Sequence, residues 1–141
     1  MRLELTKRCE LALQAMATLP HGRQVPGRDL ARSIGVSIHY LPQIMTPLVK
    51  AGWVSSAPGR NGGYTRTATL ASVSALELIE AIEGPTDTGT CVLKGGPCDD
   101  EEQCTLHVPW SRARTALLAE LGRTTLAEAT HPSTDTKEGR R

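Results

Sequence analysis

The sequence predicts a mainly α-helical fold with one small β-hairpin and a long helix near the C-terminus. Apolar residues recur at three- and four-residue steps in several segments, which is the periodicity of amphipathic helices. One glycine-rich stretch, residues 58–63, separates two short strand candidates. The chain has no Phe, two Trp and two Tyr, so its core must consist of aliphatic side chains packed between helices. With 141 residues there is room for one compact domain and an appended element.

The N-terminal third is expected to form three helices. Residues 5–19 place apolar side chains on one face, and the Pro-His-Gly sequence that follows ends this helix. A short second helix covers residues 28–34, and Gly35 stands where a left-handed C-terminal residue is needed. Ser37 is then the expected N-cap of a third helix, residues 38–51. A short helix, a glycine turn and a capped helix predict a helix-turn-helix. The core face of the third helix is expected to contain Ile38, Leu41, Ile44, Met45, Leu48 and Val49.

Two prolines interrupt the hydrogen bonding of the third helix. Pro42 lacks the N–H that would bond to Ile38, and Pro47 lacks the N–H that would bond to Gln43. Thr46 followed by Pro47 is also a favourable N-cap and first-turn pair. We therefore expect a kink or a new helix start at Thr46–Pro47.

A hairpin and a fourth helix follow the helix-turn-helix. Strands are expected at residues 53–57 and 64–67, because the Asn-Gly and Gly-Gly steps between them supply turn conformations. Ser74 and Glu77 form a capping box that opens a helix, and Gly84-Pro85 closes it. A helix-turn-helix followed by a hairpin is a winged helix-turn-helix, so residues 1–84 are predicted to be a DNA-binding domain.

The C-terminal part is expected to contain a loop, a long helix and a tail. Residues 85–107 form a cysteine-containing loop, and residues 108–130 form a long helix starting near Pro109 and a short terminal helix. An apolar seam on the long helix either meets a partner subunit, making it a dimerisation helix in a homodimer, or packs on the first helix. Residues 131–141 are polar enough to form a disordered tail. The seam consists of Trp110, Ala113, Leu117 and Leu121.

The charge of the chain is divided unequally. Residues 1–66 hold nine basic and three acidic side chains, whereas residues 67–141 hold seven and twelve. A basic half is suited to a phosphate backbone, so we expect double-stranded DNA as a partner. A helix in the major groove reads bases with polar residues near its N-terminus, and Arg60 on the glycine-rich wing is suited to the minor groove. The candidate DNA-binding residues are Arg28, Ser37, His39, Tyr40, Gln43, Lys50, Arg60, Asn61, Gly62 and Gly63.

The N-terminus resembles neither a signal peptide nor a membrane span, because charges interrupt its apolar residues every few positions. We therefore expect a cytoplasmic protein that does not contact a membrane. In a reducing compartment, cysteines bind metals or react with oxidants more often than they form structural disulfides. The chain has neither a CxxC pair nor an evident nucleophile beside a base, so it is not expected to be an enzyme.

Three of the four cysteines are candidates for a shared metal centre. Six residues separate Cys91 from Cys98, five separate Cys98 from Cys104, and His107 follows three positions later. The spacing is too wide for a zinc knuckle, but a glycine-rich loop can bring three thiolates around one object. Thiolates favour zinc, copper(I) or iron–sulfur clusters over hard cations, and three of them leave one coordination position for another residue.

The chain resembles the IscR/NsrR-type family of bacterial winged-helix iron–sulfur transcription regulators from residue 1 to about residue 129. The resemblance rests on the three-cysteine loop and two sequence runs, MRLELTKRCELAL and LARSIGVSIHYLPQIMTPLVKAGWVSSAPGRNGGY. It implies a homodimer with a long crossing helix and a recognition helix at residues 37–50. It further implies a two-iron or four-iron cluster on Cys91, Cys98 and Cys104 whose state controls operator binding. The expected function is a repressor-type regulator that senses redox, nitric oxide or iron status.

The resemblance leaves two candidates for the fourth ligand. His107 stands where IscR-like members use a histidine from the same loop, and Glu10 stands where NsrR-like members offer a carboxylate from the partner subunit. We favour Glu10, because a ligand donated across the dimer would couple cluster state to the angle between the DNA-binding heads. The alternative is structural zinc on the three cysteines and His107. Cys9, on the apolar face of the first helix, is expected in the core.

Overall fold

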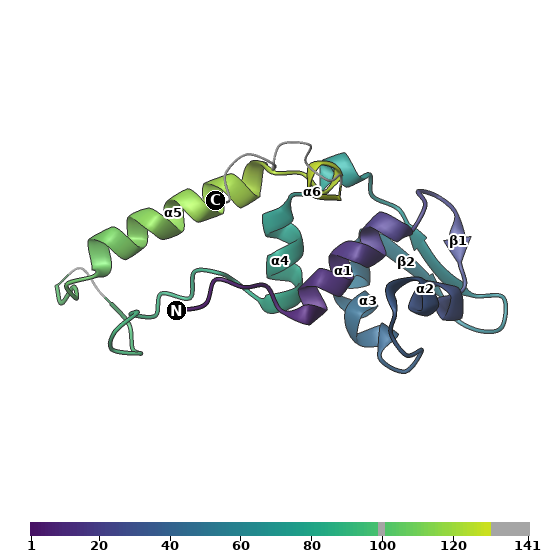
Figure 1. The fold of residues 1–141 in the computed structure, drawn as a ribbon, viewed down its shortest axis with the longest axis horizontal. Coiled ribbons are helices and arrows are strands. Elements are labelled where there is room, and N and C mark those ends of the chain that lie inside the picture. Colours follow the sequence, from purple (N-terminus) through teal and green to yellow (C-terminus); the bar gives the residue numbers. More distant parts are fainter. Residues whose placement is uncertain (99–100, 131–141) are drawn as a thin grey trace, which may run out of the picture.

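The computed structural model describes residues 1–98 and 101–130, and the predicted polar tail at residues 131–141 lies outside them. The fold is the predicted one: mainly α-helical, with a small antiparallel sheet (Figure 1). No helix in the described residues is long and apolar enough to cross a membrane. In chain order the elements are α1 Lys7–Thr18, β1 Gln24–Val25, α2 Gly27–Ile34, α3 Leu41–Lys50, β2 Val54–Ala57, β3 Gly63–Arg66, the 3-10 turn Leu70–Ser72, α4 Ala75–Glu83, α5 His107–Arg123 and α6 Leu126–Thr130.

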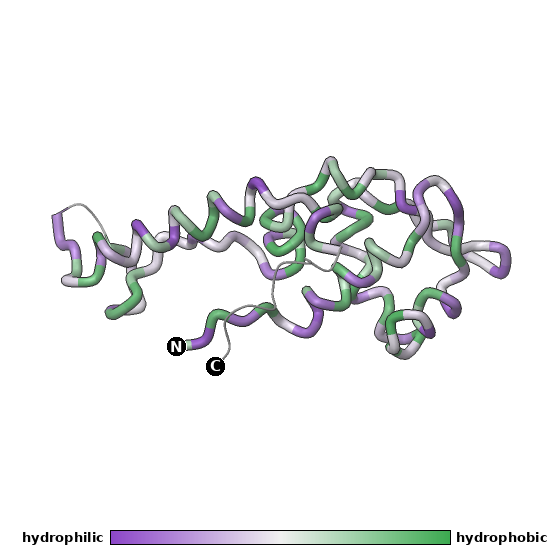
Figure 2. The backbone as a smooth tube through the Cα atoms, turned by 45° about the horizontal axis from the view of Figure 1, so that its top comes forward, coloured by the Kyte–Doolittle hydropathy of each residue, from purple (hydrophilic) through white to green (hydrophobic). Residues whose placement is uncertain are grey.

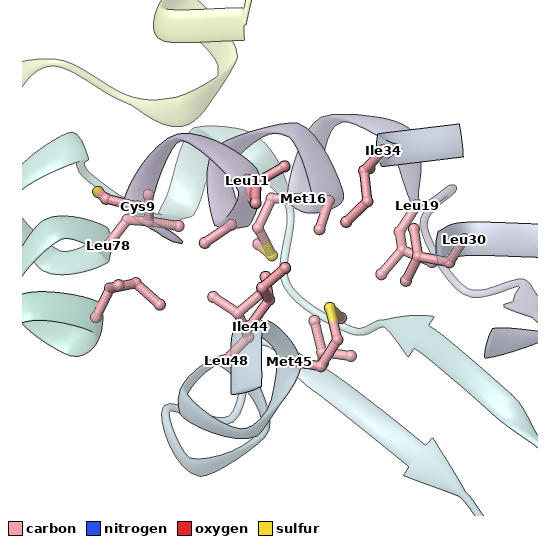
Figure 3. Packing of buried hydrophobic residues seen from close by; sticks show 14 of the residues in the cluster. Cys9, Leu11, Met16, Leu19, Leu30, Ile34, Ile44, Met45, Leu48 and Leu78 are labelled. Carbon is pink, nitrogen blue, oxygen red and sulfur yellow. The ribbon is translucent and has the colours of Figure 1, made fainter. Parts of the chain in front are cut away.

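The core lies where α1 crosses α2, α3 and α4 (Figure 3). Helix α1 begins because the Thr6 hydroxyl accepts a hydrogen bond from the Cys9 amide at 3.2 Å, which satisfies an otherwise unpaired donor. The buried face of α1 runs from Cys9 to Met16, and Ile44, Met45 and Leu48 of α3 meet it from the opposite side. Cys9 is completely buried, as expected of a core residue. These side chains fix the first turn of α1 against α3 and the rest of the helical core.

Helix α3 begins three residues later than the sequence predicts. The Ser37 hydroxyl accepts a hydrogen bond from the Tyr40 amide at 3.1 Å, so Ser37 caps an isolated turn, and the helix itself starts at Leu41. Pro42 explains the delay, because its missing N–H is harmless only in the first turn of a helix. Ile38 was expected in the core, but 48% of its surface is exposed, since it lies in that preceding turn.

A new helix start at Thr46–Pro47, one of the two predicted outcomes, is wrong. Helix α3 runs continuously through Pro47 to Lys50. Its apolar face, which includes Leu48, stays buried on both sides of the proline. Tertiary packing therefore holds a helix that local propensity alone would have interrupted.

The wing is a three-stranded antiparallel sheet in the order β1-β3-β2. Strands β2 and β3 match the prediction within one residue at each end, and Val54 pairs with Arg66. Strand β1 was not predicted, because two residues are too short to give a periodic signal. The buried Arg66 joins the wing to the core, with its Nε donating to the Leu19 carbonyl at 2.9 Å. Arg66 Nη1 also donates to the Ala68 carbonyl at 2.7 Å.

The turn between β2 and β3 depends on glycine. A Cβ atom at Gly62 would lie 2.0 Å from the Ala57 carbonyl oxygen, and one at Gly63 would lie 2.2 Å from the Val25 carbonyl oxygen. Both contacts are far inside van der Waals distance, so the backbone segments approach as closely as they do only because side chains are absent. The tip of the wing is therefore narrow and has a defined shape.

The cysteine loop and α5 form an arm, whereas α1 to α4 and the sheet form the head. The short helix α6 packs back on α1 and on the 3-10 turn of the head, where Leu126 is completely buried. The predicted capping box of α4 is present, and Gly84 ends the helix with a φ of 87°. Helix α5 begins at His107, two residues before the expected start, at the end of the arm far from the head, and runs back toward the head (Figure 1). Its principal contact is with α4, not with α1 as the intramolecular alternative required. Helix α5, which is described throughout, has no buried side chain, and hydrophobic and hydrophilic residues alternate along it (Figure 2).

Candidate nucleic-acid interface and metal centre

The N-terminal end of α3 carries the predicted base-reading residues. His39 and Gln43 are exposed, as expected, and the exposed Ser37 caps the turn that precedes the helix. Tyr40, another candidate DNA-binding residue, is half-buried and packs against the core. Ser37, His39 and Gln43 therefore offer free polar surface, whereas Tyr40 mainly supports the turn.

A groove separates this turn from the wing. It has a volume of about 720 Å³ and is lined by the start of α2, by Ile38 and by the residues of the wing turn. Arg28 on α2 and Arg60 on the wing both line it, so the fold brings together two cations that are 32 positions apart in sequence. The Gln24 amide donates to the Asn61 carbonyl at 2.7 Å and ties the wing tip to β1. Two guanidinium groups beside a glycine-lined surface suit a phosphate backbone.

A second hollow, of about 730 Å³, lies on the other side of α3. Gln43 and Lys50 line it, as does Arg8 from α1. Sequence reasoning missed Arg8, which is half-buried and donates from Nε to the Gln43 carbonyl at 3.2 Å. The available signal was Pro47, because it leaves that carbonyl without its usual helical donor.

The three loop cysteines converge at the start of α5. The Sγ atoms of Cys91, Cys98 and Cys104 all lie within 4.8 Å of one another, and all four cysteines of the chain are free thiols. Cys91 is 5% exposed and the other two are half-buried. A pocket of about 220 Å³ surrounds them, and its floor includes Trp110 and Arg114 from the first turns of α5. The three cysteines that were predicted to share a metal centre, spread over 14 residues of sequence, therefore lie close together.

The thiols differ in acidity for identifiable reasons. The pKa of Cys91 is lowered to about 7, mainly because the backbone N–H groups of Lys94 and Leu93 stabilise its thiolate. The Lys94 amide lies 3.4 Å from Cys91 Sγ. Desolvation raises the pKa of Cys104, and the neighbouring Cys91 thiol adds to that effect. The triad therefore contains one thiol that ionises readily beside another that holds its proton.

The two candidates for a fourth ligand lie in different places. His107 is the first residue of α5, and its Nδ1 is 3.2 Å from Cys98 Sγ. Glu10 is exposed on α1, where its carboxylate binds Lys7 at 2.8 Å and Gln14 at 3.3 Å. Among the described residues, the compact group of candidate metal ligands contains only the three cysteines. Within one chain His107 is beside the triad, while Glu10 belongs to the surface of the head.

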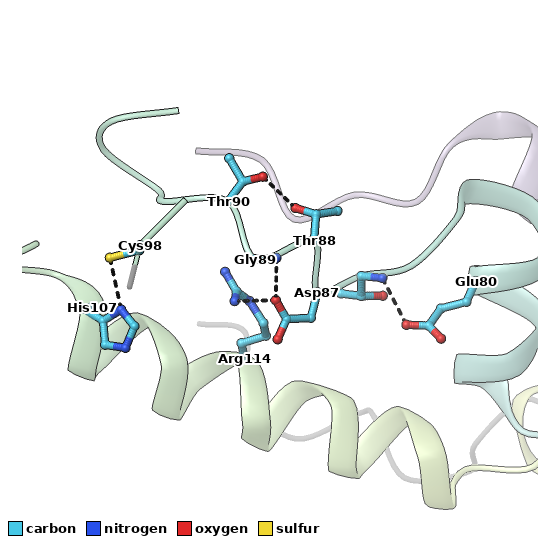
Figure 4. A network of polar contacts seen from close by, with 9 residues as sticks. Glu80, Asp87, Thr88, Gly89, Thr90, Cys98, His107 and Arg114 are labelled. Carbon is cyan, nitrogen blue, oxygen red and sulfur yellow. Dashed lines mark hydrogen bonds and ion pairs between the residues drawn. The ribbon is translucent and has the colours of Figure 1, made fainter. Parts of the chain in front are cut away.

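Polar contacts connect the entry of the cysteine loop to both neighbouring helices (Figure 4). Asp87 pairs with Arg114 of α5 at 3.0 Å, and the same carboxylate oxygen accepts the Gly89 amide at 3.1 Å. The Thr86 amide donates to Glu80 of α4 at 3.0 Å. The segment that leads into Cys91 is therefore held between α4 and α5.

Comparisons with known proteins agree with this architecture. The Rrf2 family profile, described as an iron-dependent transcriptional regulator, matches residues 5–132. The chain is 32% identical over 129 residues to the HTH-type transcriptional regulator IscR of Escherichia coli, covering 89% of this chain and 79% of that protein.

Solved structures give the same result. CymR, the global cysteine regulator of Bacillus subtilis, superposes with a TM-score of 0.71 at 30% identity, covering 91% of this chain and 96% of that one. An IscR structure from T. potens matches in fold, with a TM-score of 0.61 at 23% identity and coverage of 97% and 94%. The resemblance to the IscR/NsrR-type regulators and the winged-helix prediction are confirmed. The chain belongs to the Rrf2 family of transcriptional regulators.

Proposed function

We propose that this regulator binds a double-stranded DNA operator as a homodimer and senses redox, nitric oxide or iron status through an iron–sulfur cluster on Cys91, Cys98 and Cys104. Repression is the proposed output. The observation that carries the proposal is the convergence of three thiols within 4.8 Å, in a chain whose other half is a helix-turn-helix with a basic, glycine-tipped wing. Residues 1–84 form the DNA-binding domain, 85–107 the cluster loop, and 108–130 the dimerisation segment in this proposal.

The cysteine pocket has the donor set that such a cofactor requires. When bound, an iron–sulfur cluster supplies a group that oxidants and nitric oxide attack, and soft thiolates are its preferred ligands. Two backbone N–H groups lower the pKa of Cys91 to about 7 and so favour its thiolate form. Glycines with positive φ at positions 89 and 95 let the loop fold around the sulfurs. The residues present therefore fit either a two-iron or a four-iron cluster.

Zinc is the competing cofactor, and one contact favours it. His107 Nδ1 lies 3.2 Å from Cys98 Sγ, so a Cys₃His set is available within one chain. Thiolates around one tetrahedral ion lie about 3.8 Å apart, given a metal–sulfur distance of about 2.3 Å. The three cysteine sulfurs, which lie within 4.8 Å of one another, are close to that spacing. In that case the loop would be a structural clamp without a signal. The low pKa of Cys91 serves both metals equally.

The exposed apolar residues of α5 support the proposed dimer. Helix α5 presents Leu117 with 41% of its surface exposed, together with the half-buried Trp110 and Leu121. A second α5 crossing this seam would cover it. The same crossing would bring Glu10 of the partner subunit toward the cysteine pocket as the fourth ligand. Loss of that ligand would free one head from the other and change the spacing of the two recognition helices.

DNA recognition is assigned to three parts of the head. Ser37, His39 and Gln43 read base edges or phosphates in the major groove. Arg28, Lys50 and Arg60 bind phosphates, with Arg60 entering the minor groove. Asn61, Gly62 and Gly63 shape the wing so that Arg60 can approach. Tyr40 supports the recognition turn from its half-buried position.

Anaerobic visible and Mössbauer spectra of the purified protein test the cofactor. An iron–sulfur protein is coloured, and Glu10→Ala or His107→Ala should change the spectrum of whichever variant has lost a ligand. A colourless protein containing one zinc per chain would refute the cluster. If neither substitution changes the spectrum, both ligand assignments are wrong.

DNA binding tests the signal. Cluster-loaded and cluster-free protein are compared on a duplex that the loaded protein selects from a randomised pool, at fixed salt. The proposal predicts an affinity difference of at least about tenfold, because the two states place the heads differently. Equal affinity would rule out sensing through the cluster.

A further inference from the structure

The hydrogen bond from Arg8 to the Gln43 carbonyl fills a specific gap in α3. In an α-helix the carbonyl of residue 43 accepts the amide of residue 47, but residue 47 is proline and has no N–H. Arg8 Nε, 35 positions away in sequence, lies 3.2 Å from that carbonyl oxygen. A side chain from α1 thus replaces the donor that the recognition helix lacks.

Arg8 donates from a firmly held position. It lies in the first turn of α1, between Thr6, which caps the helix, and the completely buried Cys9. The Thr6 amide in turn donates to Glu83 of α4 at 2.8 Å. Arg8 as a whole is half-buried, and it lines the hollow that Gln43 and Pro47 also line. The backbone of Gln43 is therefore fixed by α1 as well as by its own helix.

We infer that Arg8 is a positioning residue for base reading: by occupying the carbonyl left open by Pro47, it sets the orientation of the Gln43 turn of the recognition helix. The inference rests on the proposed DNA-binding function. It also gives α1 a direct route to the base-reading surface, because Glu10, the proposed ligand for the partner's cluster, lies only two residues from Arg8. A movement of this turn of α1 is passed to α3 through one hydrogen bond.

The competing role for Arg8 is an ordinary phosphate contact. Lys50 lines the same hollow and carries the same charge, but it lies beyond the proline gap in the last turn of α3. A phosphate contact weakens binding to all sequences uniformly when it is removed and lowers the salt dependence. A positioning residue alters discrimination at one base pair. Lys50 is therefore the matched comparison for Arg8.

A double-mutant cycle in the absence of DNA tests the structural half of the inference. Arg8→Ala should lower the melting temperature by on the order of 4 °C, because the Gln43 carbonyl, which has no amide donor from residue 47, loses its charged donor. In a Pro47→Ala background residue 47 supplies its own N–H, so the same substitution should cost less than half as much. Lys50→Ala should be insensitive to residue 47. Equal effects of Arg8→Ala in both backgrounds would overturn the inference.

Binding to a selected duplex and to its single-base variants tests the functional half. Arg8→Ala should reduce discrimination about three- to tenfold at the base pair where Gln43→Ala also loses it, and leave discrimination at the other positions unchanged. Lys50→Ala should weaken all duplexes alike. A uniform loss with Arg8→Ala would make it a phosphate contact and overturn the inference. Failure of the wild type to select any duplex would instead refute the proposed function, and the melting cycle would still report on Arg8 and Pro47.

Discussion

The head and the arm of this regulator are stabilised in different ways. The head has a continuous core in which α1, α2, α3 and α4 bury aliphatic side chains against one another. In the arm, α5 buries no side chain, and the loop entering the cysteine pocket is held by the Asp87–Arg114 pair and by amide contacts. Burial of apolar surface supplies most folding free energy, so the head holds its shape by itself. In the proposed function, the cofactor and the partner subunit would add the contacts that the arm lacks.

The two regions shift the pKa of a cysteine thiol in opposite directions, and this gives the largest expected difference. Burial in the head, followed by the charge of Glu83, raises the pKa of Cys9 to about 11, whereas N–H donors in the loop lower the pKa of Cys91 to about 7. Only the thiolate reacts with iodoacetamide. In metal-free protein at pH 7, Cys91 should be alkylated on the order of a thousandfold faster than Cys9.

The pH dependence gives the control. Deprotonation creates the reactive form, so the Cys91 rate should rise as the pH rises through about 7 and then level off, while Cys9 should stay unreactive through neutral pH. Peptide mapping by mass spectrometry measures both rates in one sample, and Cys91→Ser confirms the assignment. Similar rates for the two thiols in folded protein would contradict the proposed difference between head and arm.

Two glycines, Gly62 in the wing and Gly96 in the cysteine loop, test whether the head is packed more tightly than the arm. Gly62→Ala places a Cβ atom 2.0 Å from the Ala57 carbonyl oxygen, so the wing must shift. We expect a loss of about 1–3 kcal/mol in the free energy of unfolding and at least about a tenfold loss in DNA affinity, because Arg60 lies on the same turn. A Cβ atom at Gly96 meets nothing within 4 Å. Gly96→Ala should therefore change stability by less than about 0.5 kcal/mol.

Urea denaturation of both variants, with DNA binding measured in parallel, provides the check. If Gly62→Ala has the stability of the wild type, the wing is flexible enough to absorb a methyl group. If Gly96→Ala is as damaging as Gly62→Ala, the cysteine loop is packed as tightly as the wing. Either result would remove the contrast between the two regions.

The difference between head and arm also explains what could be predicted from the sequence. Periodicity and capping located the helices of the head, and the Ser74–Glu77 capping box was placed correctly, because these signals are local. The errors at Ile38 and Thr46–Pro47 arose where tertiary contacts outweighed local ones: Pro42 postponed the start of α3, and core packing carried the helix through Pro47. The Cys91, Cys98 and Cys104 grouping was predictable from residue type, but the Arg8 contact links positions 35 apart and has no periodic signature.

The smallest expected effect concerns the Asp87–Arg114 pair, which joins the arm to its loop. The Asp87 side chain is 56% exposed, so solvent screens the pair, and Arg114→Ala should lower the free energy of unfolding by less than about 1 kcal/mol. The local effect should be larger, because Asp87 also accepts the Gly89 amide and loses its anchor on α5. Hydrogen exchange at residues 86–91 should accelerate several-fold, and 1 M salt should accelerate it in the wild type as well.

Arg112→Ala is the matched control, since Arg112 lies on the same helix and forms no ion pair with any described residue. Unchanged exchange in Arg114→Ala, or an equal change in Arg112→Ala, would show that the loop is held by its backbone contacts alone.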